Sequence, residues 1–160
     1  VRDVAVHLTH SHTSPARAMI AACRFGFRFN TMIRELALRD DTTADQAASK
    51  LRAMVGSRRH PIGTTPMAPL LDSLLHGQDI AVPLGLDRPM PTDAATACAD
   101  YLWSTGFPFH ARRRNEGRRY VATDCDFAAG TGAVVEAPIR DIVMLFGGRT
   151  NAAGALAPST

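Results

Sequence analysis

Lysine is almost absent from this sequence. Lys50 is the only lysine among 18 Lys and Arg residues, so the formal net charge of +3 comes from arginine. Richness in Arg, Ala, Gly and Pro is typical of a GC-rich genome, and so mild a charge does not indicate a nucleic-acid partner. No apolar run approaches the roughly 20 residues that span a bilayer, and the first residues do not have the pattern of a secretory signal. We expect a cytoplasmic bacterial protein with no membrane partner.

Cysteine is also scarce. Cys23, Cys98 and Cys125 are odd in number, widely spaced and without any Cys-x-x-Cys. This pattern favours small hydrophobic side chains in a reducing compartment over a disulfide framework, and a redox or zinc-thiolate role is the less favoured alternative. The glycine pairs at 130/132 and 147/148 lack the strand–turn–helix context of a phosphate loop, which excludes nucleotide binding. A nucleophile elbow is also missing.

Apolar periodicity predicts a mainly α-helical chain. With 46% hydrophobic residues in 160, the chain can bury a core of one domain, with or without a small appendage. Helices are expected over residues 1–10, 16–38, 44–55, 66–81, 93–104 and 139–146. We predict that Thr43 and Thr92 cap the helices that follow them. Short strands are expected over 120–123 and 133–136, around a turn at 130–132. The predicted organisation is a helical domain, 1–105, followed by a small α+β region, 106–160.

The most informative motif is an Asp-x-x-x-His in an apolar helix. Asp72 and His76 stack on one helical face, and burying a carboxylate beside an imidazole is costly unless something satisfies both. His7 lies on the apolar face of the first helix, so we predict that His7, Asp72 and His76 form one open metal site. The alternative is that this common spacing arose by chance and that the histidines are hydrogen-bonded or exposed. Asp79 either orients a ligand imidazole or is a helix-end carboxylate, and for Gln78 a solvent-facing position stays open.

Five arginines gather between the last predicted helices. We interpret them as solvated side chains in and next to a polar turn over 112–117. The alternative is that they contact a phosphate, an acidic partner or a substrate carboxylate. They are Arg112, Arg113, Arg114, Arg118 and Arg119. For the neighbouring His110, a less favoured interpretation is that it lines a pocket where the two regions meet.

Three segments resemble one family. Val1-Arg2-Asp3-Val4-Ala5-Val6-His7-Leu8 resembles the second-helix motif of DinB-like metal-binding four-helix bundles, and more narrowly of the mycothiol-dependent maleylpyruvate isomerase family. The run from Leu74 to Ile80, followed by Pro83-Leu84-Gly85, is similar to that family's third-helix signature. The passage from Trp103 to Asp124 resembles its entry into a small C-terminal α+β region, so the likeness covers roughly residues 1–150.

The resemblance implies a fold, a site and a chemistry. It implies a DinB-like up-down helical bundle that lacks its first helix, which agrees with a chain that opens in the middle of a helical pattern. Without that helix one flank of the bundle would be uncovered, and this would favour homo-oligomers. It implies His7, Asp72 and His76 as metal ligands, with Asp72 where the characterised isomerases have glutamate. The implied cofactors are mycothiol and a divalent metal, zinc being favoured over iron, nickel or cobalt.

The implied reaction is thiol chemistry on a small electrophile. A low-molecular-weight thiol would add to the substrate as a thiolate, leading to cis–trans isomerisation or thiol transfer. Two alternatives stay open: a metal-binding relative without isomerase activity, and a non-catalytic interaction or regulatory module of the DinB-like superfamily.

Overall fold

The computed structural model describes residues 1–9, 35–36, 38–60 and 64–149. Most of the helix expected over residues 16–38, together with Cys23 and the tail after Arg149, lies outside the described residues. The chain divides into two compact units, Val1–Leu86 and Asp87–Thr160, and each is described by itself. No helix of the described residues combines the length and apolar composition needed to cross a bilayer.

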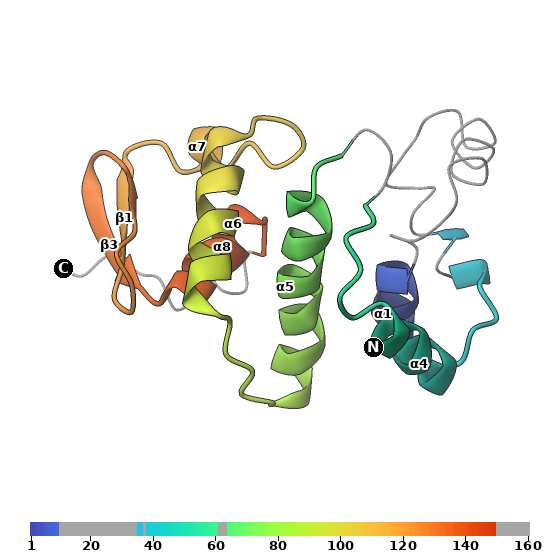
Figure 1. Ribbon diagram of the computed structural model, residues 1–160. Helices are drawn as coiled ribbons and strands as arrows, with labels where there is room; N and C mark the ends of the chain where they lie inside the picture. Colours follow the sequence, from blue (N-terminus) through green and yellow to red (C-terminus); the bar gives the residue numbers. More distant parts are fainter. Residues whose placement is uncertain (10–34, 37, 61–63, 150–160) are drawn as a thin grey trace. The chain divides into compact units, whose positions relative to one another are not determined.

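In the first unit, a short helix packs against two longer ones (Figure 1). The described elements are α1 (Arg2–Thr9), α4 (Ala44–Ala53), α5 (Met67–Ala81) and the 3-10 turn η2 (Val82–Leu84). Helix α1 contacts both α4 and α5, and Val6 at its centre is fully buried. Leu71 and Leu75 contribute the buried face of α5. This packing places the inward residues of α1 against α5.

The ends of α4 and α5 follow local chemistry. Thr43 caps α4 as predicted: its hydroxyl accepts a hydrogen bond from the Gln46 amide at 3.2 Å, and the Gln46 side chain accepts one from the Thr43 amide at 2.9 Å. Helix α5 ends at Ala81, and η2 carries the chain one turn further through Pro83 to Gly85, whose φ is +64°. A glycine adopts that left-handed conformation without strain, which is why the helical path ends there.

The second unit covers a small sheet with two helices (Figure 1). Its elements are α6 (Thr92–Ser104), α7 (Ala111–Arg114), β1 (Arg118–Ala122), β2 (Ala128–Gly130), β3 (Ala133–Ala137) and α8 (Ile139–Phe146). The strand order is β2-β1-β3, with β1 antiparallel to β2 and parallel to β3. Tyr120 pairs with Ala129 on one side and Val135 on the other. Helix α6 packs along α8, and α8 contacts β1.

An aromatic cluster forms the centre of this unit. The Phe146 ring lies 5.0 Å from Trp103, 5.2 Å from Tyr120 and 6.4 Å from Phe127, measured between ring centroids. Phe146 and Tyr120 are completely buried. Each fully buried ring of this size contributes about 2–3 kcal/mol of hydrophobic stabilisation. The cluster therefore ties α6 and α8 to the sheet.

Three local predictions need correction. Thr92 is the first residue of α6 and not its cap, because Pro91 occupies the capping position and offers no side-chain acceptor. The segment over 112–117 is not entirely a turn, since its first residues belong to the helical turn α7. The strands expected over 120–123 and 133–136 are present as β1 and β3, but they pair in parallel, and β2 was not predicted.

The fold class is mainly α-helical with a small C-terminal α+β part, as expected. Among the described residues, strands occur only in the second unit. The last helix begins after Pro138 and ends at Phe146, before Gly147, where the sequence predicted it.

Candidate functional site

Helices α1 and α5 bring His7 and His76 into contact. Their ring centroids lie 4.9 Å apart, and the ring planes meet at 84°, an edge-to-face arrangement. His7 lies in the last turn of α1 and its Nδ1 atom is buried. The His76 side chain keeps 22% of its surface exposed. Two imidazoles from distant parts of the sequence therefore share one partly buried place between two helices.

Asp79 holds the ring of His76. Its Oδ2 lies 2.8 Å from His76 Nδ1, one helical turn away on α5. A carboxylate only accepts hydrogen bonds, so Nδ1 is the protonated nitrogen and donates to Asp79. In the neutral ring, Nε2 then carries the free lone pair, which is available to a proton or a metal. Of the two interpretations of Asp79, the one that orients His76 agrees with this contact.

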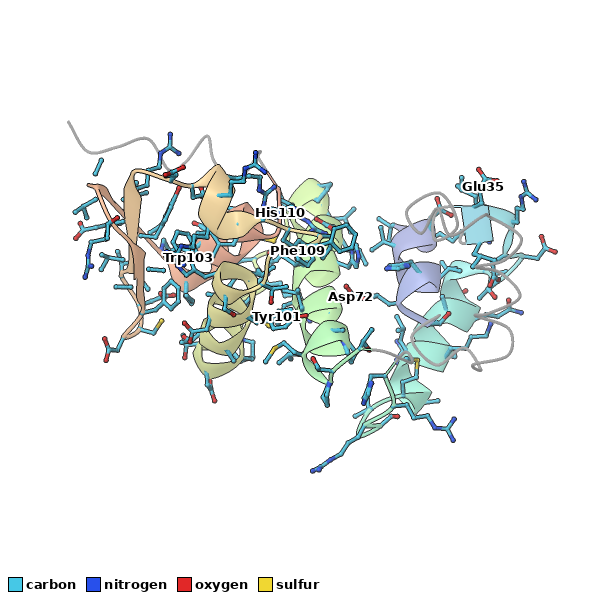
Figure 2. All side chains as sticks on the ribbon, turned by 90° about the horizontal axis from the view of Figure 1, so that it is seen from above. Glu35, Asp72, Tyr101, Trp103, Phe109 and His110 are labelled. Carbon is cyan, nitrogen blue, oxygen red and sulfur yellow. The ribbon has the colours of Figure 1, made fainter. Side chains whose placement is uncertain are left out.

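Asp72 lies one turn before His76 on the same helix. It is half-buried, and Figure 2 shows it on the side of α5 that faces α1. Within the parts of the chain that the structure describes, no three His, Cys, Asp or Glu side chains come close enough to hold a metal ion. The structure thus brings together two of the three predicted ligands, while Asp72 shares their side of the helix without completing a group of three.

Gln78 and the cysteines add little to this site. Gln78 is 1% exposed, which removes the solvent-facing alternative. Within the described part of the chain Cys98 and Cys125 form no disulfide, and burial raises the pKa of Cys98 to about 11. Cys98 is fully buried in α6, which agrees with the interpretation of a small hydrophobic side chain. Cys125 lies 3.4 Å from the hydroxyl of Thr96.

No family model, curated protein or solved structure matches this chain. The resemblance to maleylpyruvate isomerases therefore depends on the residues quoted above.

Proposed function

We propose that the protein is a metal-dependent, mycothiol-using enzyme of the maleylpyruvate isomerase family, with His7, Asp72 and His76 holding a divalent metal. The observation that carries the proposal is the contact between His7 and His76 together with the hydrogen bond from His76 Nδ1 to Asp79. The proposed fold of the first unit is a DinB-like helical bundle in which α1 and α5 carry the ligands.

The donor set suits a divalent metal. Histidines that bind metals in proteins regularly donate their second ring nitrogen to a carboxylate, which fixes the tautomer and makes the other nitrogen a better donor. Asp79 has that relation to His76. Asp72 would supply an anionic oxygen from the same side of α5. Two imidazoles and one carboxylate are a donor set that would accept zinc, iron, nickel or cobalt.

The chemistry follows from such a site. His7, Asp72 and His76 would hold the divalent cation, which would lower the pKa of a thiol and so supply a thiolate near neutral pH. Asp79 keeps the proton on Nδ1 of His76, and the packing of α1 on α5 limits the access of water to the imidazoles. The proposed reaction is addition of the mycothiol thiolate to an electrophilic alkene. Bond rotation and elimination of the thiolate then return the trans isomer, or the carbanion takes up a proton from water and the thiol stays on the product.

An activity assay with matched variants tests the proposal. The full chain, supplied with zinc, is assayed for mycothiol-dependent isomerisation of maleylpyruvate and for mycothiol consumption with a panel of electrophiles. We expect activity in the parent protein, and its loss in His7→Ala and His76→Ala. His60→Ala is the control, because His60 is an exposed histidine outside the site. Activity that is absent from the folded parent, or equal in all four proteins, would refute the proposal and leave the non-catalytic module as the better account.

A further inference from the structure

A cavity lies wholly within the second unit. It has a volume of about 710 Å³ and is lined by the end of α6, by α7 and by the starts of β1 and of the turn after β2. Trp103 and His110 are among its lining residues, and Figure 2 shows Trp103 on the side of α6 that faces the sheet. None of its lining residues belongs to the histidine pair or to α1 or α5. The cavity is therefore a candidate site independent of the proposed metal centre.

The cavity is strongly basic. Arg112, Arg113 and Arg118 are among its lining residues, and Glu116 is the single acidic residue among them. These three arginine side chains make no hydrogen bond or ion pair with the part of the chain that the structure describes. Arg114, their neighbour on α7, has a structural contact instead, donating to the Phe146 carbonyl oxygen at 2.7 Å. Among the described residues, the three arginines that line the cavity are therefore not held by a structural contact.

The backbone brings these charges together. Two of the arginines are on α7 and one is on β1, and the buried Asn115 joins the two elements. Its side chain donates to the Ala111 carbonyl at 2.8 Å and accepts a hydrogen bond from the Tyr120 hydroxyl at 2.7 Å. Like charges gathered at one cavity repel each other, and a cavity of one sign concentrates counter-ions. A bound anion would relieve that repulsion.

The remaining wall offers a flat surface and a further polar group. The indole of Trp103 packs against Phe146, at 5.0 Å between centroids, and a Cβ on Gly130 would lie 3.1 Å from its Cη2 atom. The ring is therefore held in a fixed position. His110 has a φ of +50°, which is uncommon for a residue with a side chain and is frequent at binding sites. His110 is one of the residues that line the same cavity.

We propose that this cavity binds a small organic anion with two or more carboxylate or phosphate groups. Guanidinium groups bind both kinds of oxyanion through paired hydrogen bonds, so the chemistry is shared by organic acids and phosphate esters. The volume is in the range of sites for molecules of metabolite size. The planar indole contacts the carbon skeleton of the ligand, while Arg112, Arg113 and Arg118 hold its anionic groups.

Trp103 provides a direct readout, because it is the only tryptophan of the chain and it lines the cavity. The full chain is titrated with citrate, with inorganic phosphate and with a sugar bisphosphate at constant ionic strength, and tryptophan fluorescence is recorded. We expect a saturable change with a Kd below about 1 mM for at least one probe. Comparison of the Kd of citrate with those of the two phosphate probes shows whether the site prefers carboxylate or phosphate groups.

Two variants of one strand provide the matched comparison. Arg118→Ala removes a lining guanidinium, and Arg119→Ala removes an exposed arginine of β1 that does not line the cavity. We expect Kd to rise about tenfold or more in Arg118→Ala and in Arg112→Ala, and to stay within about twofold in Arg119→Ala. An unchanged fluorescence with every probe, or equal weakening in both β1 variants, would overturn the proposal. So would tenfold tighter binding of a single-stranded oligonucleotide than of any small anion.

Discussion

The buried contact between Tyr120 and Asn115 makes a sharp prediction about the second unit. Tyr120 is completely buried and Asn115 is 5% exposed, and the tyrosine hydroxyl donates to Asn115 Oδ1 at 2.7 Å. Tyr120→Phe keeps the ring against Phe146 but removes the donor. A lost hydrogen bond that leaves a buried acceptor unsatisfied costs about 1–3 kcal/mol. We expect the free energy of unfolding to fall by about 2 kcal/mol.

A double-mutant cycle separates this contact from other effects of the substitutions. Asn115→Ala removes the bond to Tyr120 and also the bond to the Ala111 carbonyl, so it should cost at least as much as Tyr120→Phe. The double variant should be less destabilised than the sum of the two, with a coupling energy of about 1 kcal/mol or more. Urea unfolding followed by Trp103 fluorescence measures all three, because Trp103 packs on Phe146 in the same cluster.

The chain offers a matched control in its other tyrosine. Tyr101 is half-buried on α6, and its hydroxyl makes no hydrogen bond within the described residues (Figure 2). Tyr101→Phe should therefore change the free energy of unfolding by less than about 0.5 kcal/mol. Equal stabilities for the two Tyr→Phe variants, or a coupling energy near zero, would refute the role given to the Tyr120–Asn115 contact.

Two further predictions concern close packing and a buried thiol. Gly130→Ala should destabilise the protein by about 2 kcal/mol or more, because φ is +87° and a Cβ would overlap the Arg118 carbonyl oxygen. Gly117→Ala should cost less, because at Gly117 φ is +78° and a Cβ would meet open space. Equal losses of stability in thermal or urea unfolding would contradict this prediction. Burial raises the pKa of Cys98 from 9.0 to about 11, so the folded state binds the thiol proton more tightly and stability should fall as pH rises through that window. Cys98→Ala should reduce this fall in stability with pH. An unchanged pH profile of urea unfolding in the variant would contradict the role given to the Cys98 thiol.

Much of the helical architecture could be predicted from apolar spacing. Helices α5 and α8 have inward residues at helical periods and clear ends, and their observed bounds lie within a residue of the prediction at most boundaries. Strand β2 is only three residues of Ala and Gly, which have low strand propensity, so no local pattern indicates it. Its existence depends on pairing with β1, and that pairing is a tertiary contact.

The candidate site, too, could be predicted from the sequence only in part. The inward position of His7 and the helical placement of His76 predict their meeting, because both lie on apolar faces of helices. The role of Asp79 could not be decided from the sequence, since a residue three positions along a helix can face its neighbour or solvent. The basic cavity corresponds only to less favoured interpretations of His110 and the arginines, because these residues come together through the tertiary contact that the buried Asn115 makes between α7 and β1.

Metal content is the measurement that tests the central claim most directly. Purified parent protein, His7→Ala, His76→Ala and the control His60→Ala are analysed by elemental mass spectrometry after reconstitution with zinc and removal of free metal. We expect about one equivalent of zinc in the parent and in the control, and its loss in the two site variants. Asp79→Asn should weaken zinc binding by about 10- to 100-fold. Folded parent protein without zinc, or the same zinc content in all variants, would contradict the account.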